Sequence, residues 1–135
     1  MPEMAHYTGL VTEPLFQPSV GGFAQGMLVN VPLHYRQLKS GVKGADIAAC
    51  LKKHYEESLF VTVVEENDVS KFERGAFLRP DALKNTNKLE LFVNYNDEKE
   101  LVVLTARLDN LGKGASGAAV QNLNLALGIK EDEGL

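Results

Sequence analysis

The feature that most constrains this fold is a helical segment near the end of the chain that carries no charge. Between Lys113 and Lys130 no Asp, Glu, Lys or Arg occurs. A surface helix of a small domain normally has one charged face and one apolar face. The segment 115–127 lacks the charged face, and Gly128, a common helix terminator, follows it. We expect this helix to be buried. A tightly packed core helix is one reading, but the absence of charge on every side favours contact with a surface outside this chain.

Small residues crowd the start of the same helix, namely Gly114, Ala115, Ser116, Gly117 and Ala118. Small side chains allow another backbone or a flat ligand to come close. A turn that leads from a strand into a helix also presents free N–H groups, which can bind an anion or a carboxamide oxygen. The turn 109–114 is therefore the candidate binding site of the sequence.

Alternation with a period of two predicts the strands. Residues 27–35 alternate and form one strongly apolar face, while Pro32 favours an edge position or a bulge. The β-branched run 59–64 predicts a second strand. Two further runs, 88–94 and 101–108, are joined by a short polar turn and predict an antiparallel hairpin.

Helical periodicity appears between the first two strands. Apolar or aromatic residues recur at helical spacing at Ile47, Cys50, Leu51, His54 and Tyr55. Short helical character is also expected at 2–6, and irregular chain at 14–26 and 65–84. The order of strand, helix, strand, hairpin and helix predicts one α+β domain over residues 1–135, with helices on one face of a mostly antiparallel sheet.

Composition excludes several classes of protein. The chain has 135 residues, 44% of them hydrophobic and 24% charged, which fits one globular domain rather than a disordered chain. A net charge of −4 argues against a nucleic-acid or anionic-membrane partner. Prolines and glycines interrupt the charge-free stretch 14–35, so it is not a membrane span. One cysteine and no basic-then-apolar leader predict a cytoplasmic protein.

Residues that carry chemistry are sparse. Cys50 lies on the apolar side of its predicted helix, so we expect a small buried core residue, with a nucleophile assisted by His54 as the alternative. The other histidines, His6 and His34, show no metal-ligand spacing with cysteines or carboxylates. The residues predict no metal site and no complete catalytic set in this chain.

A long run at the end of the chain carries a family resemblance. It reads Asp109-Asn110-Leu111-x-Lys113-Gly114-Ala115-x-Gly117-x-Ala119-Val120-Gln121-Asn122-x-Asn124. This run closely resembles the C-terminal signature of the N-acetyl-gamma-glutamyl-phosphate reductase family. The resemblance covers nearly the whole chain through shorter elements: Pro2-Glu3-Met4, Phe16-x-Pro18, Gly26-Met27, Tyr55-x-x-Ser58-Leu59-Phe60-Val61 and Asn85-Thr86-Asn87.

The resemblance implies a fold and an activity. The fold is that of a glyceraldehyde-3-phosphate-dehydrogenase-like C-terminal domain. The activity is NADP-dependent reduction of N-acetyl-gamma-glutamyl phosphate to the semialdehyde, in arginine biosynthesis. In such enzymes a Rossmann NADP-binding domain, a catalytic cysteine and a catalytic histidine precede the matched residues. All three lie outside this sequence, so we expect the chain alone to be inactive and to bind NADPH weakly or not at all.

The resemblance also assigns site residues. It implies that Asn110 reaches the nicotinamide carboxamide of NADP, that Lys113 and Gly114 line the same pocket, and that Glu3 lies near the substrate. A local cap at the strand-to-helix turn is the alternative role of Asn110. Gln25 stands where many relatives have a basic residue, which argues against a phosphate-binding role there.

Two apolar patches predict self-association. The stretch 14–35 and the final helix together offer more apolar surface than a monomer usually exposes. We expect a homo-oligomer, most simply a twofold dimer, with a compact monomer as the alternative. A function of another class also stays open, namely a free-standing α+β binding or dimerisation module without catalysis.

Overall fold

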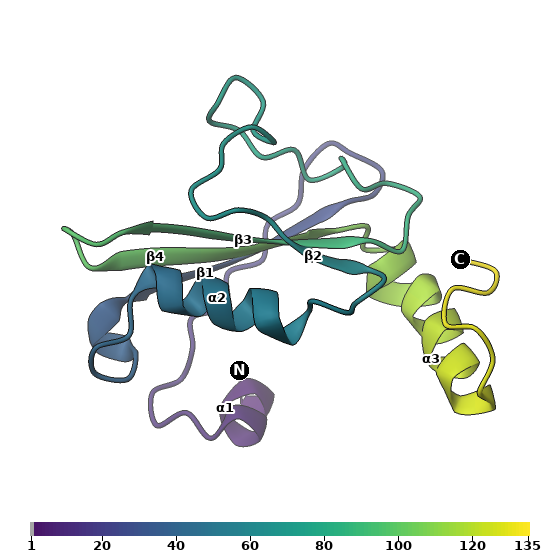
Figure 1. The fold of residues 1–135 in the computed structure, drawn as a ribbon, viewed down its shortest axis with the longest axis horizontal. Coiled ribbons are helices and arrows are strands. Elements are labelled where there is room, and N and C mark those ends of the chain that lie inside the picture. The colour runs from purple at the N-terminus through teal and green to yellow at the C-terminus, as the bar shows by residue number, and fades with distance from the viewer. Residues whose placement is uncertain (1) are drawn as a thin grey trace.

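The computed structural model describes residues 2–135 and contains a four-stranded sheet in the spatial order β1-β4-β3-β2 (Figure 1). The strands and α-helices, in chain order, are α1 (Pro2–Thr8), β1 (Met27–His34), α2 (Gly44–His54), β2 (Val61–Val63), β3 (Leu89–Asn96), β4 (Leu101–Leu108) and α3 (Gly117–Leu127). The predicted order of strand, helix, strand, hairpin and helix is therefore confirmed.

The sheet is mixed, so the expectation of a mostly antiparallel sheet was wrong. Strand β4 pairs antiparallel with both β1 and β3, but β2 pairs parallel with β3. The reason is the excursion 64–88, which passes over one face of the sheet before β3 begins (Figure 1). A crossover of that kind returns the chain in the same direction, whereas a hairpin would reverse it.

Helix α2 covers the other face of the sheet and forms the core there. Ala48, Val93 and Val102 are buried together. Gly44 begins the helix directly against the ring of Tyr95, where a Cβ atom would lie 2.1 Å from the Tyr95 Cγ. Around this cluster pack Leu33, Tyr35, Leu38, Ile47, Leu51, Tyr95 and Leu104.

Cys50 is exposed, so the expectation of a buried cysteine was wrong. Two helical positions turn a side chain by about 200°, and Cys50 follows the fully buried Ala48 by two positions. His54 is exposed as well. The buried stripe of α2 is therefore centred on Ala48 rather than on Cys50.

Helix α3 leaves the end of the sheet instead of lying on it (Figure 1). Leu123, Leu125 and Leu127 are 56%, 56% and 65% exposed. Leu123 and Leu127 lie one turn apart on the same side, and Leu125 lies about 200° around the helix from Leu123. Gly128 ends the helix in the left-handed conformation at φ 68°, as the sequence predicts. The uncharged helix is thus not a core helix of this domain, and its leucines face away from the packed sheet.

Candidate functional site

The junction between β4 and α3 is organised by one buried carboxylate. Asp109 directly follows β4, and its side chain is 1% exposed. Four N–H donors surround it, and they come from three separate parts of the chain. They are Leu111 N at 2.9 Å and Gly112 N at 3.2 Å on Oδ1, with Asn85 N at 2.7 Å and Gln25 Nε2 at 2.6 Å on Oδ2.

No cation is among these four donors. Burial by itself would raise the pKa of Asp109, but the backbone N–H groups of Leu111, Asn85 and Gly112 outweigh burial, with help from Gln25. The pKa of this carboxyl group therefore lies below its ordinary value. The negative charge is stabilised by oriented dipoles, which fix the backbone that carries them.

Asn110 makes a long-range bond and does not act as the local cap. Its Oδ1 accepts a hydrogen bond from Gly26 N at 2.8 Å, across 84 positions of sequence. Asp109 caps the turn instead, through Leu111 and Gly112. Gly26 has φ 122°, and a Cβ atom there would lie 2.5 Å from the carbonyl oxygen of Pro80, so only glycine fits.

The other end of the Asn110 amide is available. The residue is half-buried, and its Nδ2 has no hydrogen-bond partner among residues 2–135. Because Gly26 N is a donor, the atom facing it must be the amide oxygen. The NH₂ group of Asn110 is therefore the free end, and it can donate to a carbonyl oxygen of a ligand.

Lys113 is held beneath the start of α3. Its ammonium group donates to Gln121 Oε1 and lies 5.4 Å from the centroid of the Phe60 ring. Gln121 also accepts from Asn87 Nδ2 at 3.1 Å and donates to Glu131 Oε1 at 2.6 Å. Burial lowers the pKa of Lys113, and the charge of Glu131 partly opposes that effect. Lys113 thus belongs to a network that ties α3 to the chain end.

The small residues at this junction make room for the chain itself. A Cβ atom at Gly117 would lie 2.3 Å from Asn87 Oδ1, and one at Gly112 would lie 2.9 Å from the carbonyl oxygen of Thr86. At Gly114 a Cβ atom would make ordinary contacts of 3.4 Å with Leu108 Cδ1 and the carbonyl oxygen of Asp109. The close neighbours are therefore the backbone of Thr86 at Gly112 and the Asn87 side chain at Gly117.

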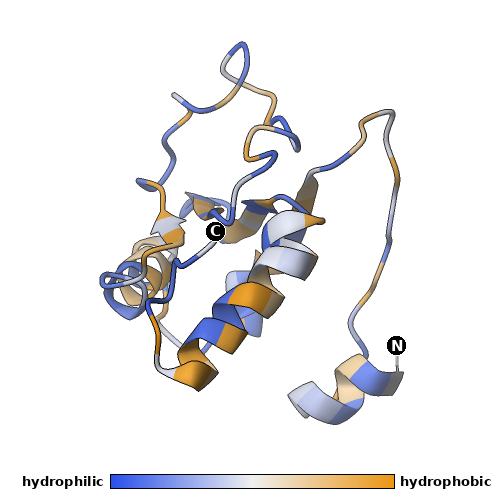
Figure 2. Cartoon of the chain, turned by 90° about the vertical axis from the view of Figure 1, so that its right-hand side faces the viewer, coloured by the Kyte–Doolittle hydropathy of each residue, from blue (hydrophilic) through white to orange (hydrophobic). Residues whose placement is uncertain are grey.

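Glu3 does not join this junction. It lies in α1, which stands apart from the sheet on the end of an extended segment (Figures 1 and 2). Its side chain is exposed. Of the residues predicted for the site, Asn110, Lys113 and Gly114 lie together, and Glu3 lies elsewhere.

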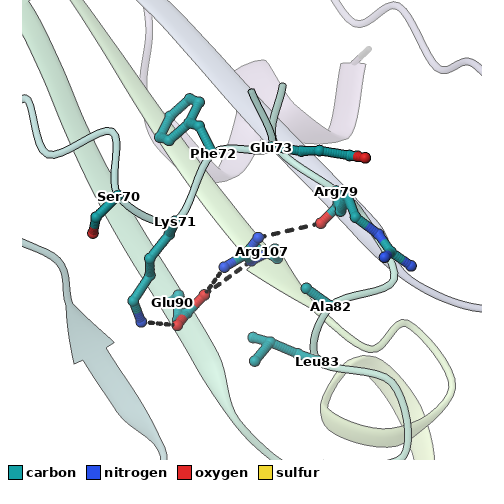
Figure 3. A pocket seen from close by; sticks show the side chains of 9 residues that line it. All are labelled: Ser70, Lys71, Phe72, Glu73, Arg79, Ala82, Leu83, Glu90 and Arg107. Carbon is teal, nitrogen blue, oxygen red and sulfur yellow. Dashed lines mark hydrogen bonds and ion pairs between the residues drawn. The ribbon is translucent and has the colours of Figure 1, made fainter. Parts of the chain in front are cut away.

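A second polar cluster lies on the sheet face opposite α2, in a hollow under the excursion 64–88 (Figure 3). Glu90 Oε2 accepts from Arg107 Nε at 2.9 Å and from Arg107 Nη2, while Glu90 Oε1 accepts from Lys71 Nζ. Arg107 lies 5.2 Å from the centroid of the Phe92 ring. Its Nη1 donates weakly to the carbonyl oxygen of Arg79 at 3.4 Å.

In this cluster one carboxylate is paired with two cationic side chains. Burial would raise the pKa of Glu90, but hydrogen bonds from Lys71 and Arg107, and their charges, lower it below its ordinary value. This pair is not among the residues predicted from the sequence. Its signal was readable, because Glu90 lies opposite Arg107 in the register of the predicted hairpin. The cluster fastens the excursion to the sheet, because both cations bond to the same Glu90 carboxylate.

Two negative findings apply to residues 2–135. They contain no group of three or more His, Cys, Asp or Glu side chains placed to hold a metal ion. None of their helices combines the length and the apolar character needed to cross a membrane.

Comparison with known proteins gives one family match. Residues 1–110 match the family described as "Semialdehyde dehydrogenase, dimerisation domain". The matched region ends at Asn110, so it includes the sheet and the Asp109 carboxylate but not α3.

Three curated relatives match nearly the whole chain. The N-acetyl-gamma-glutamyl-phosphate reductase of Trichormus variabilis is 47% identical over 133 residues, which is 98% of this chain and 41% of that protein. The protein of the same name from Burkholderia cenocepacia is 43% identical over 95% of this chain and 40% of its own length. N-acetyl-gamma-glutamyl-phosphate reductase 2 of Pseudomonas putida is 41% identical over 99% of this chain and 42% of its own length. The chain therefore spans about two fifths of the length of these relatives.

Proposed function

Because this chain belongs to the family of semialdehyde dehydrogenase dimerisation domains, we propose that it is the C-terminal, dimer-forming part of an NADP-dependent N-acetyl-gamma-glutamyl-phosphate reductase of arginine biosynthesis. The observation that carries this proposal is 47% identity over 98% of the chain to a reductase of that name. We extend the proposal to a glyceraldehyde-3-phosphate-dehydrogenase-like fold, with a Rossmann NADP-binding domain in the part of the relatives' length that this chain does not span.

The proposed reaction reduces an acyl phosphate to an aldehyde and releases inorganic phosphate. NADPH, when bound, supplies the hydride. The catalytic cysteine and histidine belong to the part of the protein outside these residues, and the exposed Cys50 is not assigned a role in the reaction. Glu3, Lys113 and Gly114 stay predicted site residues, with Glu3 on the substrate side.

Asn110 is the residue of this chain that fits a cofactor contact. The residue is half-buried, its NH₂ group has no partner among residues 2–135, and the amide is held in place by the bond from Gly26 N to Oδ1. Such a donor matches the carbonyl oxygen of the nicotinamide carboxamide. One contact of this kind contributes about 1 kcal/mol, whereas micromolar binding needs about 8 kcal/mol. The chain alone should therefore bind NADPH weakly, and the phosphates and adenosine must be held by the nucleotide-binding domain.

The exposed side of α3 supports contact with that domain. Leu123, Leu125 and Leu127, in the second half of α3, are each more than half exposed among residues 2–135, and α3 itself carries no charged side chain. The chain end folds back along α3, where Asn124 Nδ2 donates to the carbonyl oxygens of Glu131 at 3.0 Å and Glu133 at 2.9 Å. We assign the exposed side that carries Leu123 and Leu127 to contact with the nucleotide-binding domain of the same polypeptide.

Strand β1 supports the pairing of two copies. On the α2 side of the sheet, Met27, Val29 and Val31 are 36%, 44% and 43% exposed and form a continuous apolar strip. Pro32 has no N–H to offer to an added strand. Contact through the face of β1 is therefore favoured over edge-to-edge pairing, and a twofold dimer is the simplest closed arrangement.

The proposed activity is tested with the full-length protein that contains this chain. Purified protein is assayed for NADP⁺ reduction with N-acetylglutamate semialdehyde and phosphate, and the isolated 135-residue chain is the matched control. We expect turnover by the full-length protein and none by the chain. A full-length protein that shows no turnover, and no NADP⁺ binding in calorimetry, would contradict the proposal and favour a binding or dimerisation module.

Self-association is tested by light scattering of the chain at micromolar concentration. A dimer mass is expected, and Val29→Asp and Val31→Asp should shift it towards the monomer. Leu123→Ser on α3 is the matched control and should leave the dimer intact. A strictly monomeric mass that does not change on concentration would contradict the β1 interface.

A further inference from the structure

Asp109 and Asn110, which are adjacent at the β4–α3 junction, have different roles. We propose that Asp109 is a positioning residue, which fixes the amide of Asn110 so that its NH₂ group meets the carbonyl oxygen of the cofactor carboxamide. This inference rests on the proposed function, because it assumes that Asn110 lies at the nicotinamide. It adds the residue that sets the direction of the contact and the atom that is recognised.

The direction of the Asn110 amide follows from its bond to Gly26. Oδ1 accepts the Gly26 N–H at 2.8 Å, so a 180° flip of the amide would place NH₂ against N–H. The amide therefore presents a donor to the ligand side. It selects an acceptor, the carbonyl oxygen, because its own oxygen is turned towards Gly26 N.

Asp109 bonds to the residues next to both partners, Gly26 and Asn110. On one side Oδ2 accepts from Gln25 Nε2 at 2.6 Å, and Gln25 is the residue that precedes Gly26. On the other side Oδ1 accepts from Leu111 N at 2.9 Å, directly after Asn110. The same carboxylate thus fixes the segment that donates to the Asn110 oxygen and the backbone that carries the Asn110 side chain.

Gln25 acquires a role that the sequence analysis did not find. Its amide nitrogen donates to Asp109 Oδ2 and to Asn85 Oδ1 at 2.8 Å. A basic side chain at this position would also donate to the Asp109 carboxylate. Arginine is therefore the conservative substitution for Gln25, and alanine is the one that removes the tether.

The experiment measures binding rather than turnover. Dissociation constants of NADP⁺, its 3-acetylpyridine analogue and its thionicotinamide analogue are measured by isothermal titration calorimetry with the full-length protein. The acetylpyridine analogue keeps the carbonyl oxygen and loses the NH₂ group. The thionicotinamide analogue keeps the NH₂ group and replaces the oxygen with sulfur, a weak acceptor.

The expected result is a preference set by the oxygen. Wild-type protein should bind the acetylpyridine analogue about as well as NADP⁺ and the thionicotinamide analogue about tenfold more weakly, the worth of one good hydrogen bond. Asn110→Ala should abolish the preference. Asp109→Asn and Gln25→Ala should reduce it to about threefold or less, and Gln25→Arg should restore it. Glu90→Gln, which alters the other buried carboxylate, should retain the full preference.

Each outcome bears on one claim. If Asn110→Ala keeps the oxygen preference, the cofactor contact in the proposed function is wrong. If Asn110→Ala loses it but Asp109→Asn and Gln25→Ala keep it, the positioning role of Asp109 is overturned while the proposed function stands. If Asp109→Asn does not fold, Gln25→Ala decides, because it removes the tether of a single half-buried side chain. Circular dichroism confirms the folding of each variant at the temperature used.

Discussion

The two buried carboxylates of this domain are stabilised in opposite ways. Glu90, on the sheet face opposite α2, is paired with two cationic side chains, Lys71 and Arg107. Asp109, at the end of the sheet, is surrounded by three backbone N–H groups and one side-chain amide. Neutral partners leave the charge of Asp109 uncompensated, yet its pKa is below the ordinary value.

The difference indicates that Glu90 has a structural role and that Asp109 organises the candidate binding site. In the Glu90 cluster, a carboxylate and two cations come from two strands and from the excursion 64–88, so their ion pairs hold the excursion against the sheet. At Asp109 the partners are backbone groups, so the product is a fixed backbone path next to a free amide. The type of partner, cationic side chain or neutral N–H group, thus distinguishes the structural carboxylate from the one that arranges a binding group.

The largest expected effect comes from breaking the Glu90 cluster. Arg107→Met leaves a buried carboxylate with only the half-exposed Lys71, so the free energy of unfolding should fall by about 3–5 kcal/mol. Urea denaturation followed by circular dichroism measures it. The double variant Glu90→Leu with Arg107→Met removes both charges and should recover most of the loss. A single variant within 1 kcal/mol of wild type would show that the pair does not hold the fold.

A smaller loss is expected at Asp109. Asp109→Ala leaves four N–H donors without their acceptor, and the free energy of unfolding should fall by about 1–3 kcal/mol. Asp109→Asn keeps one oxygen for Leu111 and Gly112 and should lose less. The same denaturation measurement checks both variants. A larger loss of unfolding free energy for Asp109→Ala than for Arg107→Met would contradict the structural role given to the Glu90 cluster.

Acid should weaken both regions in the same direction. The pKa of each carboxyl group is lowered by folding, so each contributes stability above its unfolded pKa, about 4, and that stability is lost as pH falls through the lower folded pKa. Denaturation midpoints measured from pH 6 down to pH 2.5 should fall in wild type. Asp109→Asn should show a shallower fall, because one titrating group is gone. An unchanged slope would mean that Asp109 does not titrate with folding.

The smallest effect is expected for a substitution at an exposed position away from both carboxylates. Cys50→Ala on the exposed side of α2 should change the free energy of unfolding by less than about 0.5 kcal/mol. A thiol reagent should label Cys50 in the native chain without unfolding it. A loss of about 1–2 kcal/mol, as expected for a buried group, would contradict the exposed position of Cys50.

Local patterns in the sequence were enough to predict most elements. The alternation over 27–35 and 101–108 gave β1 and β4, and Pro32 gave the edge position of β1. The parallel direction of β2 was not predictable in this way, because the excursion between β2 and β3 shows no period that distinguishes a crossover from a long hairpin loop. The phase of α2 was misjudged because Cys50 and His54 were counted with the apolar residues while Ala48 was not.

In the candidate site too, short-range features were predictable from the sequence and long-range contacts were not. The short-range part was visible, since the turn 109–114 was selected for its small residues and its position before a helix. Its partners were not, because Gln25 and Asn85 are 84 and 24 positions away from Asp109 and neither has a local pattern. The role given to Asn110 came from a family resemblance, and the atom it presents came only from the bond to Gly26.

The most direct test of the contrast between the carboxylates is a pH titration followed by nuclear magnetic resonance. Backbone amide shifts of Leu111, Gly112 and Asn85 are recorded in the chain as the pH is lowered. All three should follow one titration, that of Asp109, with a midpoint below the ordinary aspartate pKa of about 3.9. Amides that do not move, or that follow a midpoint at or above the ordinary value, would contradict a carboxylate held by backbone N–H groups.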